Sequence, residues 1–309
     1  MESYFLRRLL GVLPTLFIVI TVTFFLVRLA PGGPFDQEQA LTPEVRANLE
    51  AAYGLDQPML VQYGRYLAGL ARGDFGPSFK YRDFTVTELI AQGLPVSLGL
   101  GVAAMLLAIA VGVGGGILAA LRRGWSDGAI RSLAVLGIAI PSFVAAPLLA
   151  LVFGIYLGWL PVGGWEGRLQ DAVLPVVALA LPITAVLVRM TRGGLLEVLT
   201  SNHVRSARAR GLPESRVILR HALRPALTPV ISYVGPATAA ILTGSLVVET
   251  IFNLPGMGRY LVQGAVNRDY TLVLGMVIVY ATLTILMNLL VDLLYAWLNP
   301  RVRMDNGAP

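Results

Sequence analysis

The sequence predicts an all-α, polytopic membrane protein with six transmembrane helices. Of its 309 residues, 56% are hydrophobic and only 14% are charged, whereas about 25% are charged in an ordinary soluble domain. The mean hydropathy is +0.71, and six apolar segments each provide the roughly 20 helical residues that a bilayer core requires. These values exclude a water-soluble globular protein.

The six apolar segments are the predicted spans. They cover residues 9–30, 94–121, 132–158, 172–191, 228–248 and 271–298. The first segment follows Arg7 and Arg8, as the apolar part of a signal peptide would. However, Arg28 occupies the position where a cleavage site needs a small residue. We therefore expect residues 1–30 to form an uncleaved N-terminal anchor helix.

Prolines and glycines interrupt the predicted spans. A proline inside a helix removes a backbone donor and kinks the helix. We therefore expect kinks in the third, fourth and fifth spans, at Pro141, Pro147, Pro175, Pro182 and Pro236. The glycine run from Gly112 to Gly116 in the second span predicts a face that approaches another helix closely.

The distribution of arginines predicts the orientation of the chain. Basic residues are retained on the cytoplasmic side of a membrane. Of the 24 basic residues, 15 fall on one side of the predicted spans, and eight of these lie between Arg189 and Arg224. The opposite side holds 12 of the 18 acidic residues. We therefore expect both termini in the cytoplasm, with residues 299–309 as a cytoplasmic tail.

Residues 31–93 form the longest segment on the outer side. Thr42 followed by Pro43 and Glu44 is a helix start, and Gly54 supplies a stop. A second short helix is expected from near Pro58. Two roles are open for this external segment: a lid over the first two spans, or a docking surface for an external partner.

Catalytic, metal-binding and cofactor-binding sites are not expected. The chain has no cysteine and only two histidines, His203 and His221, which cannot form a histidine-rich metal cluster. Its single lysine, Lys80, is flanked by Phe79 and Tyr81, whereas a nucleotide-binding P-loop needs Gly-Lys followed by Ser or Thr. The chain also lacks a zinc-protease histidine pair and a serine elbow. We therefore expect no enzymatic activity.

One acidic residue lies well within a predicted span. Asp292 follows Asn288 by one turn on the same face of the sixth span, and intramembrane ionisable residues are functional candidates. The position of Asp292 near the helix end favours pairing with an arginine such as Arg301. Because no relay of buried charges is present, an ion-coupled carrier is disfavoured. If the chain transports a solute, we therefore expect the energy to come from elsewhere.

The loop at residues 192–227 is the candidate docking site. Asn202 is expected to cap a short helix that Gly211 ends, and Pro213 to begin a second helix that stops before Pro225. Arginines alternate here with small residues, so a partner can approach closely while guanidinium groups bind its carboxylates. The predicted docking residues are Arg205, Ser206, Ala207, Arg208, Ala209, Arg210, Gly211 and Leu212.

Two other kinds of partner could bind a basic loop of this kind. Anionic lipid head groups would also attract its arginines. Nucleic acid is disfavoured, because no aromatic residue interleaves with the arginines for base stacking.

The loop resembles that of a known family. The stretch VRSARARGLPESRVILRHALRPALTPV at 204–230 resembles the cytoplasmic coupling loop of permease subunits of ATP-binding-cassette importers, in the branch that takes up peptides and nickel. The general loop pattern of that superfamily begins Glu-Ala-Ala, with glycine four residues after the second alanine. Counting back from Gly211 places Arg205, Ser206 and Ala207 there, so this chain lacks the glutamate.

Further blocks extend the resemblance over essentially the whole chain. They are similar to the B-type permease of oligopeptide importers, and the blocks are RRLLGVLPTLFIVITVTFFLVRLAPGGPF at 7–35, GDFGPSFKY at 73–81, IPSFVAAPLL at 140–149, RMTRGGLLEVL at 189–199, GSLVVETIFNLPGMG at 244–258 and NRDYTLV at 267–273.

The resemblance implies a fold, a function and a set of partners. It implies a type I importer permease fold, with a five-helix core at residues 94–298, in the inner membrane of a bacterium. The chain would form half of a heterodimer with a second permease and translocate oligopeptides inward. Two ATPases would hold ATP and magnesium, and an extracytoplasmic protein would bind the peptide. The helix from Ser206 to Gly211 would lie in a groove of one ATPase.

The segment after the fifth predicted span contains a proline and two glycines that predict a turn. Glu249, Pro255, Gly256 and Gly258 are expected to line the outer mouth of the pathway, where Glu249 would meet a peptide amine or pair with Arg259.

Alternative solutes are dipeptides, nickel or another small molecule. A self-sufficient ion-coupled carrier or channel is the alternative from a different functional class.

Overall fold

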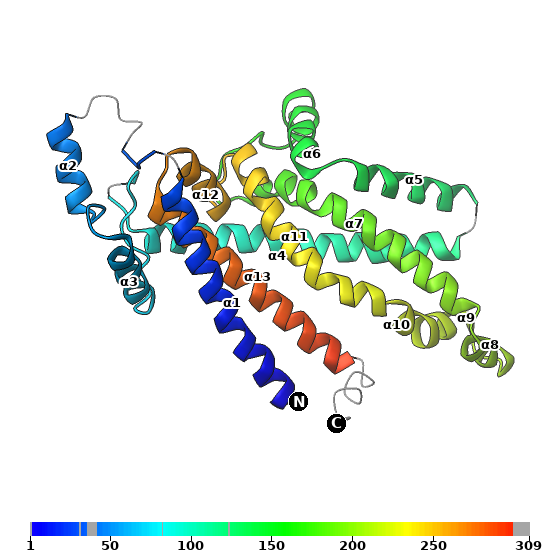
Figure 1. The fold of residues 1–309 in the computed structure, drawn as a ribbon. Coiled ribbons are helices and arrows are strands. Elements are labelled where there is room, and N and C mark those ends of the chain that lie inside the picture. The colour runs from blue at the N-terminus through cyan, green and yellow to red at the C-terminus, as the bar shows by residue number, and fades with distance from the viewer. Residues whose placement is uncertain (1, 31, 36–41, 82, 123, 299–309) are drawn as a thin grey trace. The chain divides into compact units, whose positions relative to one another are not determined.

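The computed structural model describes residues 2–30, 32–35, 42–81, 83–122 and 124–298. In these ranges the regular secondary structure is helical, apart from one isolated β-bridge between Pro77 and Thr85. The helices are, in chain order, α1 (Glu2–Leu29), α2 (Pro43–Ala52), α3 (Met59–Leu70), α4 (Val86–Leu121), α5 (Trp125–Ala139), α6 (Ser142–Leu149), the π-helix η1 (Ala150–Tyr156), α7 (Leu169–Leu199), α8 (Asn202–Ala209), α9 (Glu214–Arg216), the π-helix η2 (Val217–Ala222), α10 (Leu223–Ala226), α11 (Thr228–Ile251), α12 (Met257–Val266) and α13 (Tyr270–Leu298) (Figure 1).

The number of membrane spans agrees with the prediction. In the described part of the chain, five helices are long and apolar enough to cross a membrane: α1, α4, α7, α11 and α13. The bent pair of α5 with α6 and η1 supplies a sixth span when it is counted as one. The all-α fold with six spans is therefore confirmed.

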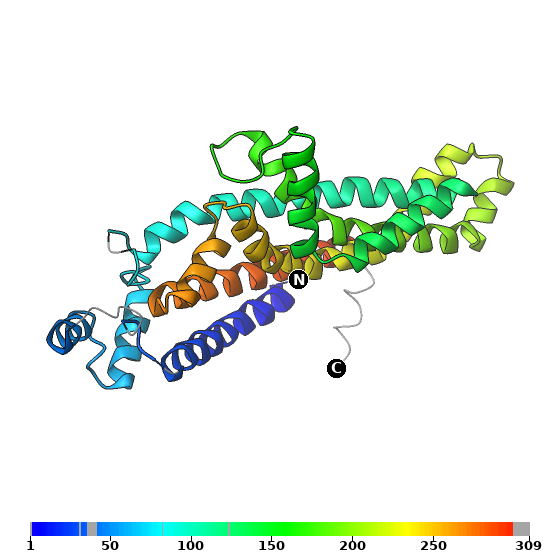
Figure 2. The same cartoon turned by 90° about the horizontal axis from the view of Figure 1, so that it is seen from above.

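The third span is broken rather than kinked. Its two halves meet at an angle of 106°, and α6 leaves the line of α5 in both views (Figures 1 and 2). The break falls at Ile140 and Pro141, because Ile140 has the extended backbone that a residue before proline prefers. By contrast, Pro147, Pro175, Pro182 and Pro236 lie inside helices without such a break.

Two spans are longer than the apolar pattern predicted. Helix α4 begins at Val86 because Thr85 and Glu88 form a capping box, in which the backbone N–H of Thr85 donates to Glu88 Oε2 at 2.8 Å. Helix α7 continues to Leu199, into the predicted loop 192–227. The start of that loop is therefore the end of a span.

Packing divides the chain into two compact units. Of the described residues, the first contains those within 2–97 and 255–285, and the second contains those within 98–254 and 286–298. These units describe which residues pack together. The predicted division into anchor, external segment, core and tail refers to the membrane instead, and it stays a prediction.

The two short helices predicted in the external segment are present in the first unit. Thr42 caps α2 by accepting a hydrogen bond from Val45 N at 3.4 Å, and Gly54 follows the helix with φ at +65°. Pro58 precedes α3. Helix α3 packs on α1, where Tyr63 lies beside Phe24 with ring centroids 5.0 Å apart.

A buried carboxylate joins two distant segments of the first unit. Asp269, at the start of α13, is fully buried. Its Oδ2 accepts hydrogen bonds from Ser78 Oγ at 2.5 Å, Phe79 N at 2.9 Å and Lys80 N at 3.1 Å. Its Oδ1 accepts from Leu272 N at 3.1 Å. The loop after α3 is thereby tied to α13, a connection that the sequence analysis missed.

In the second unit, α4 packs closely against α7. An added Cβ at Gly112 would lie 2.6 Å from Leu187 Cβ, and one at Gly116 would lie 2.5 Å from Thr191 Cβ. The predicted close-approach face of the glycine run is therefore confirmed. Residues four apart lie on the same face of a helix, which explains why these two glycines make the contact.

Helix α5 is joined to α7 by an ion pair that the sequence analysis missed. Arg192 donates to Asp127 through both Nε, at 2.6 Å from Oδ1, and Nη2, at 2.8 Å from Oδ2. Arg131 lies one turn after Asp127 on α5, and its Nε is 3.5 Å from Oδ1. Such a two-pronged pair fixes geometry as well as supplying energy. Arg192, which the sequence presented only as an orientation signal, therefore also connects two helices.

Candidate functional site

The predicted docking loop folds as a short helix followed by a longer helical segment. Helix α8 begins after Ser201, one residue earlier than predicted, and ends before Arg210. Gly211 then has φ at +72°, a backbone conformation that glycine adopts without strain. From α9 the chain stays helical through η2 and α10 to Ala226.

Pro225 does not end this helical segment, contrary to the prediction. Proline has no N–H to donate to the carbonyl four residues earlier, which here belongs to His221. The Nε2 atom of His203, on α8, lies 3.3 Å from that carbonyl oxygen. The π-helical turn η2 lies directly before α10. This wider turn and the histidine contact accommodate the proline.

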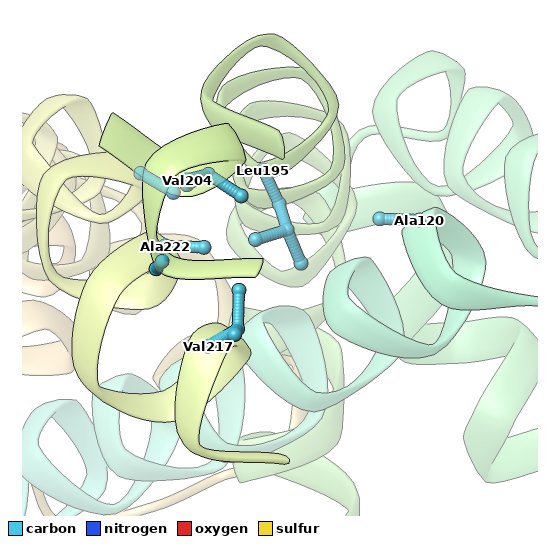
Figure 3. Close-up of a cluster of buried hydrophobic side chains, with 7 residues drawn as sticks. Ala120, Leu195, Val204, Val217 and Ala222 are labelled. Carbon is cyan, nitrogen blue, oxygen red and sulfur yellow. The ribbon is translucent and has the colours of Figure 1, made fainter. Parts of the chain in front are cut away.

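The buried side of α8 is fixed to two spans. Val204 and Ala207 pack with Val217 and Ala222 of η2 and with Leu195 of α7 (Figure 3). Ala120 of α4 and Ala226 of α10 complete this set, which we call the α8 anchor cluster. Val204, Leu195, Val217 and Ala222 have no exposed surface. Because a closely packed core transmits displacement, α8 is mechanically connected to α4 and α7.

The predicted docking residues separate into two groups. Six of them are exposed: Arg205, Ser206, Arg208, Ala209, Arg210 and Gly211. Ala207 is only 2% exposed, and Leu212 packs against the α8 anchor cluster. These last two residues therefore hold the loop in place and do not present a surface to a partner.

Arg208 is already engaged within the chain. Its Nε donates to Glu214 Oε2 at 3.1 Å and its Nη2 to Oε1 at 2.5 Å, while Nη1 lies 3.4 Å from Leu199 O. The hydrogen bonds from Arg208 hold the pKa of the Glu214 carboxyl below its usual range. The pair is therefore present above that range, and it is lost as the pH falls through the lowered pKa. Arg205 and Arg210 become the main candidates for contacting a partner's carboxylates.

The turn of the predicted outer mouth is packed against α4. Met257 N donates to Ser97 Oγ at 2.9 Å. An added Cβ at Gly93 would lie 2.9 Å from the same nitrogen. Gly256 and Gly258 are both buried. The turn before α12 therefore lies close against α4, and Gly93 is the glycine that this approach requires.

The remaining predicted site residues take different positions. Glu249, near the end of α11, is fully buried, so it is not accessible to a peptide amine in this conformation. Pro255 is half-buried and Asn288 is exposed. The side chain of Asp292 and the whole of residues 299–309 lie outside the described residues. The roles predicted for them in the pathway and the tail stay predictions.

Known proteins resemble this chain over its whole length. Residues 112–304 match the family described as binding-protein-dependent transport system inner membrane component, and residues 1–101 match the N-terminal family of the same system. The oligopeptide transport system permease protein OppB of Salmonella typhimurium is 55% identical over 306 residues, which cover 98% of this chain and 100% of OppB.

Two further relatives extend the comparison. The dipeptide transport system permease protein DppB of Bacillus subtilis is 42% identical over 305 residues, 98% of this chain and 99% of DppB. The crystal structure of an amino acid ABC transporter with histidines matches with a TM-score of 0.53 at 18% identity, covering 70% of this chain and 94% of that one. That likeness concerns the fold. The chain therefore belongs to the family of binding-protein-dependent transport system inner membrane components, as a multi-pass ABC importer permease of the cytoplasmic membrane.

Proposed function

We propose that this chain forms one half of the transmembrane pathway of an ATP-driven importer whose substrates are oligopeptides. The support for oligopeptides is the 55% identity to OppB over nearly the whole chain, against 42% to DppB. The proposed assembly contains a second permease, two ATPases that hold ATP and magnesium, and an extracytoplasmic peptide-binding protein. In this assembly the chain itself carries out no covalent chemistry.

The observation that carries the coupling mechanism is the two-sided character of α8. One side is buried in the α8 anchor cluster, the other side exposes Arg205, and Arg210 is exposed directly after the helix. When the bound ATPases close, α8 moves with them. Val204 packs in the same cluster as Leu195 of α7. Because closely packed side chains transmit displacement, a movement of α8 also displaces the spans that pack against it. The spans then exchange between inward-open and outward-open arrangements.

The double variant Arg205→Glu/Arg210→Glu tests this docking. We expect uptake of a labelled tripeptide to fall about tenfold or more, since reversing charges that face carboxylates costs at least 1.4 kcal/mol of binding. The measurement uses proteoliposomes that contain this chain with its own partner subunits and binding protein. Membrane insertion of the variant should be unchanged, because both side chains are exposed.

Arg220→Glu is the matched control. Arg220 is exposed in the same loop but lies on η2 rather than α8. If anionic lipid alone attracts this loop, Arg220→Glu should impair uptake as strongly as Arg205→Glu or Arg210→Glu does as a single variant. Normal uptake by the double variant would remove the docking proposal.

Proteoliposomes without the ATPases separate the functional classes. The importer proposal expects no peptide uptake in them, whatever ion gradient is applied. Uptake driven by an ion gradient would establish the ion-coupled carrier instead. In the complete assembly, competition by tripeptide, dipeptide and Ni²⁺ identifies the solute, and dipeptide or Ni²⁺ competing better than tripeptide would contradict the oligopeptide assignment.

A further inference from the structure

A polar cavity of about 210 Å³ lies in the first unit, beside the C-terminal end of α1. Its walls come from α1, from α3, from the turns that flank α3 and from α13. The polar side chains among its lining residues are Arg28, Tyr53, Gln62, Arg65, Tyr66, Asp74 and Thr271. Arg65 is exposed, so the cavity reaches the surface of the protein. None of the residues in the predicted docking or outer-mouth sites takes part in it.

Arg28 is held in this cavity in a fixed orientation. Its Nε donates to Gln62 Oε1 at 2.9 Å, and its guanidinium carbon lies 3.8 Å from the centre of the Phe24 ring. Gln62 is itself fixed, because its Nε2 donates to Leu55 O at 3.0 Å and to Gln57 O at 2.7 Å. The Nη1 atom of Arg28 is buried and makes no hydrogen bond. A rigid, charged donor is therefore available.

A second donor without a hydrogen bond lines the same cavity. The hydroxyl of Tyr66 is buried and makes no hydrogen bond. Its ring lies against the same Phe24 ring, with centroids 5.8 Å apart. Burial raises the pKa of Tyr66, so the phenol keeps its proton. Leaving a buried donor unsatisfied costs about 1–3 kcal/mol, and more for a charged group. Two such donors together need an acceptor.

The charges of the lining favour a monoanion. Arg28 and Arg65 provide two positive charges, and Asp74 provides one negative charge. The carboxylate of Asp74 is turned to its own loop, where Oδ1 accepts from Gly76 N at 2.8 Å. One Arg65 nitrogen, Nη2, donates to Gln57 Oε1 at 2.6 Å. The lining therefore carries an excess of one positive charge, whereas a phosphate group brings up to two negative charges near neutral pH.

We propose that this cavity is a binding site for a carboxylate group. A carboxylate has two oxygens in one plane, so one can accept from Arg28 Nη1 while the other accepts from the Tyr66 hydroxyl. The volume suits a small group and excludes a whole peptide. The carboxylate can come from the C-terminus of a free peptide or from an acidic side chain of a protein partner. The inference depends on the cavity alone, whatever solute the permease transports.

The test compares melting temperatures of the full-length protein in detergent micelles, in sodium acetate and in sodium chloride of equal ionic strength. At ten times its dissociation constant, acetate should raise the melting temperature of the wild type by about 2 °C relative to chloride. Tyr66→Phe and Arg28→Gln should each lose this rise. Arg72→Gln is the matched control, because Arg72 is exposed beyond α3 and does not line the cavity.

Tyr66→Phe also separates binding from a structural role. Without acetate, this variant should melt no lower than the wild type, because it removes a buried hydroxyl that makes no hydrogen bond. A lower melting temperature without acetate would show that the hydroxyl already has a structural partner, and this result would overturn the proposal. The proposal would be overturned if sodium chloride raised the melting temperature as much as sodium acetate does. It would also be overturned if acetate raised the melting temperatures of Tyr66→Phe and Arg28→Gln as much as that of the wild type.

Peptide probes then distinguish the two sources of the carboxylate. If a free peptide terminus is the ligand, trialanine should saturate the effect at lower concentrations than acetate, and trialanine amide should have none. If an acidic side chain of a protein partner is the ligand, trialanine should act no better than acetate. Both results keep the carboxylate site. An equal effect of trialanine and trialanine amide would overturn it.

Discussion

Replacing Asp269 by alanine is expected to lower the free energy of unfolding by about 3–5 kcal/mol. The carboxylate is fully buried and accepts hydrogen bonds from three donors in residues 78–80 and from Leu272 N, and Thr271 Oγ1 lies 3.1 Å from its Oδ1. Its removal leaves these donors buried without an acceptor, and each such donor costs about 1–3 kcal/mol. Unfolding in mixed micelles, titrated with a denaturing detergent, measures the change.

Asp83→Ala is the control for Asp269→Ala. Asp83 lies in the segment that follows the tied loop, and its side chain is exposed, so its replacement should change the free energy by less than about 0.5 kcal/mol. Asp269→Asn should fall between the two, because the amide keeps one acceptor oxygen but turns an NH₂ group toward donors. If Asp269→Ala unfolds within 1 kcal/mol of the control, the carboxylate does not hold the two segments together.

The spans were predictable because bilayer thickness imposes a length on apolar helices. That constraint gave the six apolar segments, but it does not specify where a helix ends outside the membrane. Helix α7 runs on to Leu199 although Arg192 lies in its last part, because that arginine is paired with Asp127 of α5. A charge counted from sequence as a loop residue is in fact neutralised by a neighbouring helix. Tertiary pairing of this kind has no local signal.

The docking site was predicted as a segment but not residue by residue. The helix α8 could be located from its terminating Gly211, and alternating arginines marked it as a binding element. Which arginine faces outward depends on the helix phase and on Glu214, which the turn at Gly211 brings back to Arg208. Arg208 and Arg210 are therefore equivalent in the sequence and different in the structure.

The carboxylate cavity had no sequence signal, for a related reason. Arg28 entered the sequence analysis only as an obstacle to signal-peptide cleavage. Its orientation depends on Gln62, which is 34 residues away and lies on another helix. Only a contact between α1 and α3 reveals that a guanidinium nitrogen and a phenol share one cavity.

Replacing Gly116 by valine is expected to destabilise the second unit by about 3 kcal/mol. A Cβ at this position would lie 2.5 Å from Thr191 Cβ and 2.8 Å from the backbone oxygen of Val188. A backbone atom cannot rotate away, so α4 and α7 have to separate. Both helices also contribute to the α8 anchor cluster, through Ala120 and Leu195. Peptide uptake should therefore fall together with the free energy of unfolding.

Gly114→Val provides the matched control for this prediction. It adds the same side chain to the same helix two residues earlier, where a Cβ at Gly114 would meet no atom within 4 Å. Its effect on the free energy of unfolding should stay within about 0.5 kcal/mol, and uptake should be normal. Equal losses in both variants would mean that the glycine run affects the helix itself, through backbone flexibility. A loss confined to Gly116→Val would establish that close contact with α7 requires glycine at this position.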